Sequence, residues 1–395
     1  MNAKTTPLKW QATIIAGQSP PSDEVSEFDG RGRPFLQGNA EFGSESPVPR
    51  LRCDKTSRVA QAGDLLLSIR APVGAINRAD RDYGIGRGLA AIRPGPLLDV
   101  RFAWWWLHTS VEELRAGAVG STYDAVTADE VVALPLPILP PGEQRAIANF
   151  LDAETARIDA LITKKRRLMN LIAEHHRSRA EVLLESEQRV PLRWHAELLP
   201  GYMFSSSDFG PEELGPRLLR GTNVSVGAFN WRETVRLRLS RDRPVPHRYI
   251  LAEDDVVIGM DRPFIGGGTR VARIDADSAG ALLLQRVCRV RTPSRNNAIL
   301  IEHVLSSRRF LAHIEPDLTG VSVPHLSDEQ IGSMPVPVLS QRELAAVVLE
   351  LCELQAWKKE LSQKLEEQIT LLQERRQALI TAAVTGQSDI PEAAA

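Results

Sequence analysis

The chain repeats a segment of its own sequence about 200 residues further along. GSTYDAVTADEVVALPLPIL, from Gly120, aligns without a gap with GVSVPHLSDEQIGSMPVPVL, from Gly320. Nearer the start of each copy the offset is shorter, and PLKW from Pro7 matches PLRW from Pro191. A period of this length means that one structural unit occurs twice, so the fold must accommodate two related copies of one arrangement.

A long helix is predicted at the end of each copy. No proline or glycine interrupts the chain from Glu143 to about Leu184, or from Gln341 to Thr385. About 44 residues in a helix measure roughly 65 Å. In steps of four and three, as in a coiled coil, seven of eleven sites in the first stretch and eight of eleven in the second are apolar. The sites are Ile147, Leu151, Ile158, Leu161, Leu168, Ile172 and Val182, then Val347, Leu351, Leu354, Leu361, Leu365, Leu372, Leu379 and Ala382.

The parts that precede the helices are predicted to be mixed α and β. DLLLSI, LAAIRP, DVVIGM and VCRVRTP are typical of short buried strands, while LPLPIL and MPVPVL favour edge strands because proline cannot donate to a sheet. An apolar seam must be buried, so we expect the two helices to pack antiparallel. The predicted fold is α+β, with two repeated globular domains separated by two long antiparallel coiled-coil helices. The expected boundaries are 1–140 and 188–339 for the domains, 141–187 and 340–386 for the helices, and 387–395 for a C-terminal tail.

Composition is that of a globular protein. Hydrophobic residues make up 43% and charged residues 25%, and no run approaches the ~18 apolar residues of a membrane span. The N-terminus has no apolar core of signal-peptide length, so we expect a cytoplasmic protein. The net charge is −2, yet of 48 basic residues only 8 are Lys and 40 are Arg. Arginine reads guanine and clamps phosphate, although a GC-rich genome would also raise its frequency.

The order of these pieces resembles a known family. LPPGEQRAI from Leu139, LDAETARIDALI from Leu151 and ERRQALITAAVTG from Glu374, each placed after or between variable domains, are similar to the specificity subunit of type I restriction-modification systems. The resemblance covers essentially the whole chain. One departure is SQREL from Ser340, where the family has PPxEQ.

The resemblance implies a non-catalytic subunit whose two target-recognition domains each read half of a bipartite target in double-stranded DNA. The helices would act as a spacer and as the docking surface for DNA methyltransferase subunits, two in number; restriction/translocase subunits are a further partner that the sequence leaves open. No catalytic residue, cofactor, metal or membrane partner is expected. The docking residues implied are Glu143, Gln144, Ile147, Leu151, Ile158, Leu361, Leu365 and Leu372.

DNA contacts are predicted at arginines in glycine-rich or proline-flanked segments, because such segments favour loops and allow a close approach to phosphate. A solvated surface arginine or an ion pair inside the domain is the competing explanation for each, so the set is a firmer prediction than any member. The candidates are Arg31, Arg33, Arg70, Arg78 and Arg87 in the first domain, and Arg220, Arg262, Arg270 and Arg286 in the second.

Two other classes of function compete with this one: a self-contained methyltransferase or nuclease, and a coiled-coil adaptor that does not bind DNA. Adenine amino-methylation would require an Asn/Asp-Pro-Pro-aromatic loop, and no NPP or DPP tripeptide occurs. Two large, diverged globular domains disfavour a simple adaptor. The Trp104–Trp106 run could stack on bases but favours core packing, and the Gly266–Gly268 run favours a turn between strands over a phosphate cradle.

Overall fold

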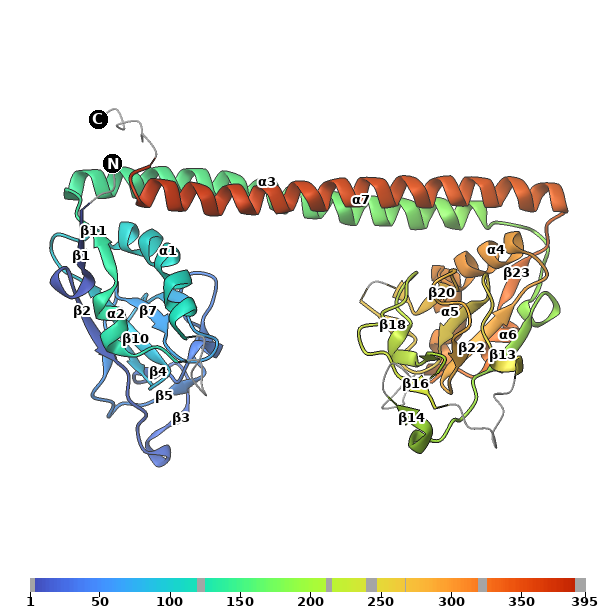
Figure 1. The fold of residues 1–395 in the computed structure, drawn as a ribbon, viewed down its shortest axis with the longest axis horizontal. Coiled ribbons are helices and arrows are strands. Elements are labelled where there is room, and N and C mark those ends of the chain that lie inside the picture. Colours follow the sequence, from blue (N-terminus) through green and yellow to red (C-terminus); the bar gives the residue numbers. More distant parts are fainter. Residues whose placement is uncertain are drawn as a thin grey trace. The chain divides into compact units, whose positions relative to one another are not determined.

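The computed structural model describes residues 4–118, 125–210, 215–238, 247–266, 268–318 and 325–387. By its contacts the chain divides into two units (Figure 1): unit 1 comprises residues 1–166 and 366–395, and unit 2 comprises residues 167–365. Each unit holds one globular part and a portion of both long helices, α3 (Pro141–Leu183) and α7 (Gln341–Val384). After Gln387, the predicted C-terminal tail lies outside the described residues.

Unit 1 is built on a four-stranded antiparallel sheet. The strand order is β2 (Ala12–Ala16), β10 (Leu89–Pro94), β7 (Leu65–Ser68) and β8 (Ile76–Arg78). Two of these, β7 and β10, are apolar runs that the sequence predicts as strands, and every residue of β7 is buried. A second sheet has the order β3 (Ser26–Glu27), β5 (Leu51–Arg52), β4 (Pro34–Leu36), β9 (Tyr83–Ile85) and β6 (Val59–Ala60).

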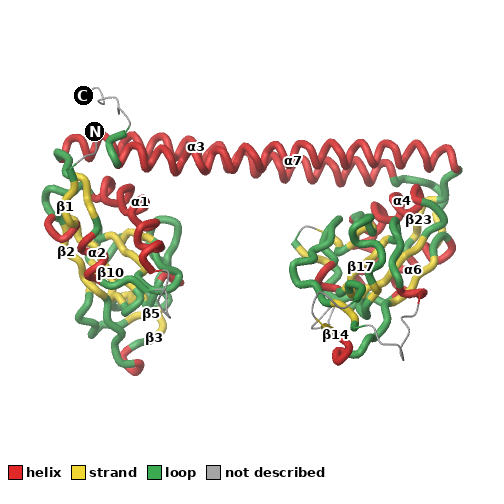
Figure 2. Tube along the Cα trace, viewed as in Figure 1, coloured by secondary structure: helices red, strands yellow, loops and turns green. Residues whose placement is uncertain are grey.

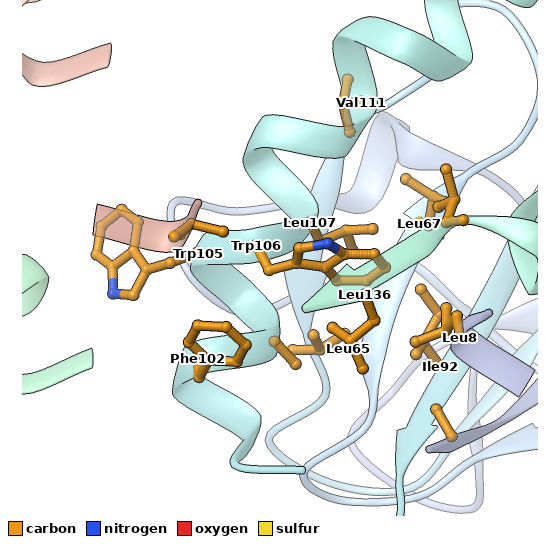
Figure 3. Packing of buried hydrophobic residues seen from close by; sticks show 14 of the residues in the cluster. Leu8, Leu65, Leu67, Ile92, Phe102, Trp105, Trp106, Leu107, Val111 and Leu136 are labelled. Atoms are coloured by element: carbon orange, nitrogen blue, oxygen red, sulfur yellow. The ribbon is translucent and has the colours of Figure 1, made fainter. Parts of the chain in front are cut away.

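Helix α1 (Val100–Ala118) supplies much of the unit 1 core. Figure 3 shows its apolar side chains lying against those of the four-stranded sheet, among them Phe102, Trp106, Leu107, Leu65, Leu67 and Ile92. Trp105 and Trp106 are 6% and 2% exposed. These two side chains of the tryptophan run are therefore core residues, as the sequence favours, and present no stacking platform.

A two-stranded ribbon lies beside the start of each long helix. In unit 1, β1 (Thr5–Pro7) pairs antiparallel with β11 (Pro135–Pro137). In unit 2, β12 (Arg189–Pro191) pairs in the same way with β23 (Pro335–Pro337). The proline-rich segments are therefore edge strands, as predicted. Each follows a short helix that begins with a capping box: α2 (Ala128–Ala133) or α6 (Asp328–Ser333).

Unit 2 repeats the architecture of unit 1, and Figure 2 shows the same mixture of helix and strand. Its central sheet has the order β13 (Glu197–Pro200), β22 (Val287–Arg291), β17 (Val256–Gly259) and β20 (Val271–Arg273). Helices α4 (Arg295–Leu305) and α5 (Arg308–Leu318) follow the sheet, where unit 1 has α1. The remaining strands form pairs: β14 (Phe209–Gly210) with β16 (Arg236–Leu237), β15 (Leu218–Leu219) with β21 (Leu282–Leu283), and β18 (Phe264–Ile265) with β19 (Gly268–Thr269). The last pair flanks the triple glycine, whose middle residue lies outside the described part of the chain.

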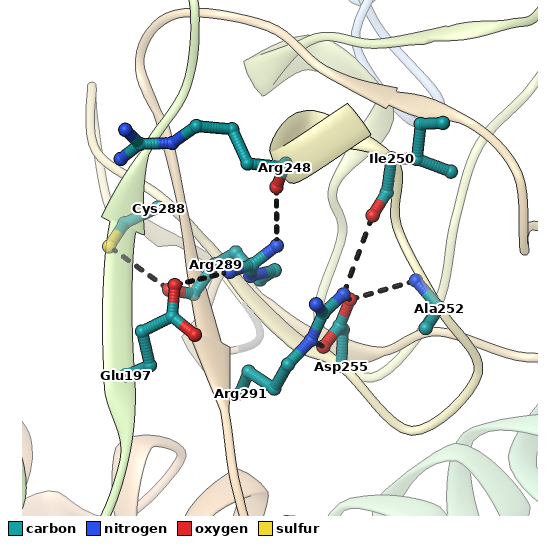
Figure 4. A network of polar contacts seen from close by, with 8 residues as sticks. All are labelled: Glu197, Arg248, Ile250, Ala252, Asp255, Cys288, Arg289 and Arg291. Carbon is teal, nitrogen blue, oxygen red and sulfur yellow. Dashed lines mark hydrogen bonds and ion pairs between the residues drawn. The ribbon is translucent and has the colours of Figure 1, made fainter. Parts of the chain in front are cut away.

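A bidentate ion pair fixes the turn before the central strand in both units. The Arg93 guanidinium donates to both carboxylate oxygens of Asp64 at 3.0 and 2.9 Å. At the matching place, Arg291 donates to both oxygens of Asp255 at 2.7 Å (Figure 4). Both aspartates also accept a backbone N–H from the turn, so each is buried with its charge satisfied. Unit 2 adds the fully buried Arg289, which donates to Glu197 and to the Arg248 carbonyl (Figure 4).

The long helices contribute to both cores. In unit 1, the first turns of α3 and the last turns of α7 share one cluster, which includes Ile147, Leu151 and Ile380. In unit 2, the end of α3 and the first turns of α7 share another, which includes Ala180 and Val348. Within each unit the two helices therefore run in opposite directions.

The predicted seam is wrong at three positions of α3. Leu161 and Leu168 are each 46% exposed and Val182 is 57% exposed, while Thr155, Ile162 and His176 are buried. After Leu151, the buried residues are Thr155, Ile158 and Ile162. Thr155 and Ile162 each lie one residue later than the position that the heptad count from Ile147 gives. An α-helix has 3.6 residues per turn, so its buried face drifts by ~20° per heptad relative to a strict seven-residue repeat.

Candidate nucleic-acid interface

In unit 1, three loops meet where the central strand β7 ends. The backbone N–H of Ile69 donates to Gly88 at 3.0 Å, and that of Val126 donates to Ile69 at 2.8 Å. Two predicted DNA-contact residues, Arg70 and Arg87, lie on these loops and are exposed. Neither guanidinium forms a hydrogen bond or ion pair with another residue that the structure describes. The loops therefore present two positive charges that have no partner among the described residues.

Unit 2 builds the same junction with different side chains. Met260 donates to Arg286 at 2.9 Å and Leu326 donates to Met260 at 2.8 Å, matching the two bonds of unit 1. Asp261 occupies the position that Arg70 has in unit 1. Arg70 forms an isolated β-bridge with Ala125, and Asp261 forms the matching bridge with His325. The two junctions therefore share their backbone hydrogen bonds and differ in their side chains.

Asp261 organises the unit 2 loops through its carboxylate. It forms an ion pair with Arg286, and its Oδ1 lies 2.6 Å from Nδ1 of His325. Burial opposes ionisation of Asp261, but the hydrogen bonds from Arg286 and His325 outweigh it and hold the pKa of the carboxyl below its ordinary value. Asp261 is therefore ionised, and its carboxylate accepts hydrogen bonds from Arg286 and His325 at the surface of the loops.

Arg262, next to this carboxylate, has an unusual backbone. Its φ is +43°, and that of Arg286 is +68°, both in the left-handed region that non-glycine residues seldom adopt. The Arg262 side chain is exposed and makes no polar contact within the described part of the chain. Such conformations cost about 1–3 kcal/mol each and concentrate at binding and catalytic sites.

Two other predicted arginines are occupied inside unit 2. Arg270 donates to the carbonyls of Val224 and Asp261, each at 3.0 Å, and burial lowers the pKa of its guanidinium. Arg220 donates to the carbonyl of Glu233 at 2.5 Å. These two guanidinium groups hold loops in place, and Arg270 in particular supports the backbone from which Arg262 projects.

The remaining candidates of unit 1 lie away from the three-loop junction. Arg33 donates to the Thr56 carbonyl at 3.4 Å, Arg31 is exposed in the same turn, and Arg78 is exposed on β8 opposite Leu65. Sequence reasoning missed Asp261 and His325. The internal repeat could have identified them. In its alignment His325 matches Ala125, and the acidic Asp261 matches the basic Arg70.

Comparison with known proteins bears on the part of the chain that holds the unit 1 loops. The family described as Type I restriction modification DNA specificity domain matches residues 51–169. The match runs from β5 into α3. The resemblance predicted from the sequence is therefore confirmed.

Two relatives are named specificity subunits. A putative type I restriction enzyme MjaX specificity subunit of Methanocaldococcus jannaschii is 38% identical over 178 residues, which are 45% of this chain and 41% of that protein. The type I restriction enzyme EcoAI specificity subunit of Escherichia coli is 34% identical over 158 residues, 40% of this chain and 26% of that protein. The chain thus matches less than half of the length of either relative.

Two solved structures share the fold. A chain from a type I restriction-modification system aligns over 98% of both chains, with a TM-score of 0.73 and 16% identity. The HsdS subunit of Thermoanaerobacter tengcongensis aligns over 98% of this chain and 97% of that one, with a TM-score of 0.52 and 15% identity.

The matched residues 51–169 also include several of the residues predicted to dock a partner. Gln144 is 4% exposed, and its side-chain amide accepts a bond from the Asp99 N–H at 2.8 Å and donates to the carbonyls of Leu97 and Leu139 at 2.9 and 2.8 Å. The glutamine of the PPGEQ motif thus ties the start of α3 to its own domain. Glu143 beside it is exposed.

In the second copy, the departure from the motif is also explained. Leu344 occupies the place of Gln144 and is buried in the unit 2 core, while Ser340 and Glu343 cap α7 reciprocally at 2.8 and 3.3 Å. The other docking candidates lie on α3 and α7. Ile147, Leu151, Ile158 and Leu365 are buried, and Leu361 and Leu372 are half-buried, so these six offer little free surface.

No cluster of three or more metal-binding side chains occurs within the described ranges, and none of the helices described there could cross a membrane.

Proposed function

We propose that the chain recognises a bipartite target in double-stranded DNA, with unit 1 reading one half and unit 2 the other. The observation that carries the proposal is the three-loop junction, whose backbone bonds recur in both units while its side chains differ. Arg70 and Arg87 in unit 1, and Arg262 in unit 2, are exposed cations without an internal partner among the described residues. Free guanidinium groups on a fixed base are suited to phosphate and guanine contacts.

The finer arrangement is also proposed. The antiparallel helices α3 and α7 would hold the two readers at a fixed separation, so that helix length sets the number of unread bases between the half-sites. Exposed residues of the helices, such as Glu143, Leu161 and Leu168, would be available to methyltransferase subunits. We propose two such subunits, a cytoplasmic location, and restriction subunits as a further partner.

The role proposed is that of a subunit without catalysis of its own. Each relative reported above is named a specificity subunit, which supports this assignment. Such a chain gains specificity because its two DNA-binding units are linked, so the affinities of the two units for their half-sites multiply when both half-sites are bound. The purified chain alone, supplied with adenosylmethionine, should leave DNA unmethylated.

The test is to measure duplex binding and methylated motifs for loop variants, with the methyltransferase of the same system present. Replacing Arg70 and Arg87 by Ala should relax one half-site, and Arg262→Ala should relax the other. Each lost phosphate contact should reduce the slope of log affinity against log salt by about 1. Arg50→Ala, an exposed arginine of unit 1 outside the three-loop junction and the long helices, is the matched control. Unchanged motifs and salt slopes for all loop variants would refute this location for DNA.

A further inference from the structure

One carboxylate in unit 2 holds two polar side chains together at the three-loop junction. Asp261 uses each of its oxygens once: Oδ2 accepts from Nη1 of Arg286, and Oδ1 lies 2.6 Å from Nδ1 of His325. The side chain of Asp261 is 23% exposed, whereas those of Arg286 and His325 are 63% and 52% exposed. The carboxylate is therefore the sheltered member of this Asp261 cluster, and the two groups that it binds face solvent.

The backbone of the cluster is held in place by the rest of unit 2. The carbonyl of Arg286 accepts the Met260 N–H at 2.9 Å, and the carbonyl of Asp261 accepts from Nη1 of Arg270 at 3.0 Å. His325 forms a β-bridge with Asp261. Groups that are fixed before a ligand arrives lose less entropy when they bind it. The Asp261 cluster is thus preorganised for binding.

The hydrogen bonds to Asp261 decide which atoms remain available. A guanidinium has five N–H donors in a planar fork, and Arg286 uses only Nη1 for Asp261. Its Nε and Nη2 have no polar partner within the described ranges, so they remain as a pair of parallel donors. An ionised carboxylate only accepts, so Nδ1 of His325 carries the proton, and Nε2 of the neutral ring is an acceptor. The cluster therefore offers two adjacent donors and one acceptor.

This set of groups is complementary to a G·C pair in the major groove. Guanine presents two adjacent acceptors, N7 and O6, and cytosine presents the N4 amino donor. Adenine has a donor in place of O6, and thymine has an acceptor in place of the amino group, so an A·T pair would oppose like with like. A phosphate offers acceptors only and would leave Nε2 of His325 unmatched. A base pair therefore fits the cluster better than the DNA backbone does.

Unit 1 has other side chains at the three matching places. Its backbone hydrogen bonds and β-bridge put Gly88 where unit 2 has Arg286, Arg70 in place of Asp261, and Ala125 in place of His325. None of these three residues carries a carboxylate or an imidazole. The complementarity to a G·C pair therefore belongs to the half-site of unit 2.

We infer that the Asp261 cluster recognises one G·C pair in the half-site of unit 2. Arg286 donates to N7 and O6 of the guanine, and Nε2 of His325 accepts from the N4 amino group of the paired cytosine. Asp261 is a positioning residue that contacts neither base. The inference rests on the proposed function, which supplies DNA as the ligand, and adds the base pair and the atoms that are recognised.

The experiment measures duplex binding by the full chain with the methyltransferase subunit of the same system. Base analogues are placed in the half-site that Arg262→Ala relaxes. 7-Deazaguanine lacks the N7 acceptor, and at one guanine it should weaken wild-type binding at least about 5-fold, whereas hypoxanthine, which keeps N7 and O6, should not. Arg286→Ala should bind the natural duplex about 5- to 150-fold more weakly and should not distinguish 7-deazaguanine from guanine.

The matched control is Arg295→Ala. Arg295 is exposed and follows β22, whereas Arg286 precedes it, so the two arginines lie at opposite ends of one strand. This variant should bind every duplex as wild type does and should keep the sensitivity to 7-deazaguanine.

Two further variants test the other members of the cluster. Asp261→Asn keeps the shape of the side chain but removes the charge that holds Arg286, so discrimination against 7-deazaguanine should fall while random duplex is bound as in wild type. Asp261→Glu should restore part of that discrimination. A merely structural role would weaken binding to every duplex alike. His325→Ala should not respond to a cytosine analogue without the N4 amino group, which wild type should bind more weakly.

Three results would overturn the inference. If wild type tolerates 7-deazaguanine at every guanine of that half-site, or if the half-site has no G·C pair, the inference is wrong while the proposed function stands. If Arg286→Ala weakens binding to all duplexes equally and reduces the salt slope by about 1, Arg286 contacts phosphate and the inference is again wrong. If wild type does not prefer the methylated motif over random duplex, the proposed function fails and this inference fails with it.

Discussion

Replacing Gln144 distinguishes an internal role from a docking role for the motif glutamine. Its amide serves three backbone groups, the N–H of Asp99 and the carbonyls of Leu97 and Leu139. A buried polar group left unpaired costs about 1–3 kcal/mol. Leu97 is exposed, so water can replace the hydrogen bond that its carbonyl loses, and only the groups of Asp99 and Leu139 stay unpaired. Gln144→Leu, which copies Leu344 of unit 2, should therefore destabilise the start of α3 by about 2–4 kcal/mol.

Hydrogen–deuterium exchange is the appropriate assay, because a chain of two units does not unfold as a single two-state system. A loss of 2–4 kcal/mol should speed exchange of the Asp99 amide by roughly 30- to 700-fold where local opening controls exchange. Peptides of α4 in unit 2 should exchange as in wild type. The reciprocal change Leu344→Gln should destabilise unit 2 instead, because it places an amide in an apolar core.

Glu143→Ala is the matched control, since Glu143 is the exposed neighbour of Gln144 on the same turn. It should leave exchange at Asp99 unchanged. If Gln144→Leu also leaves that amide protected and instead weakens methyltransferase binding, the internal role argued from the three hydrogen bonds is refuted and docking is its main role.

Three further predictions concern pH, spacing and modularity. Burial, reinforced by Lys358 and His303, lowers the pKa of His176 from 6.5 to about 4, so the folded state keeps this ring neutral. The stability present above pH 6.5 should fall by up to about 3 kcal/mol as the pH drops to 4, and a His176→Gln variant should lose that dependence in hydrogen–deuterium exchange of α3 peptides. Inserting four residues after Leu161, with a matching insertion after Leu361, should lengthen the helices by about 6 Å and widen the spacer between unchanged half-sites; unchanged spacing in active variants would rule out a ruler. Exchanging residues 1–140 for those of a relative should change one half-site only, as read by sequencing methylated motifs.

The sequence predicts the repeat, the strands and the long helices because each leaves a local signal. Proline- and glycine-free stretches give helices that end within one residue of Leu184 and Thr385, and apolar runs ending in proline give β10 and the strand before Thr292. The exposed side of α3 is less predictable, because the drift of the helix against a seven-residue repeat buries Ile162 and exposes its neighbour Leu161.

Roles of individual arginines are the least predictable part. Arg262 and Arg270 lie eight residues apart in one glycine-rich segment, yet one projects into solvent and the other donates to two carbonyls. Composition and spacing treat them alike, and only tertiary contacts separate them. The same holds for Gln144, because two of its three partners, Leu97 and Asp99, lie in a loop that the motif does not contain.

The division of the chain into units has a consequence for how the protein is made. Unit 2 is one uninterrupted run, residues 167–365, whereas unit 1 joins residues 1–166 to residues 366–395. Three buried members of the unit 1 core, Ile380, Ala383 and Val384, belong to the last turns of α7. During synthesis from the N-terminus, the unit begun first is therefore completed last, and its apolar face on α1 and α3 waits for a strip of helix that is translated only after all of unit 2.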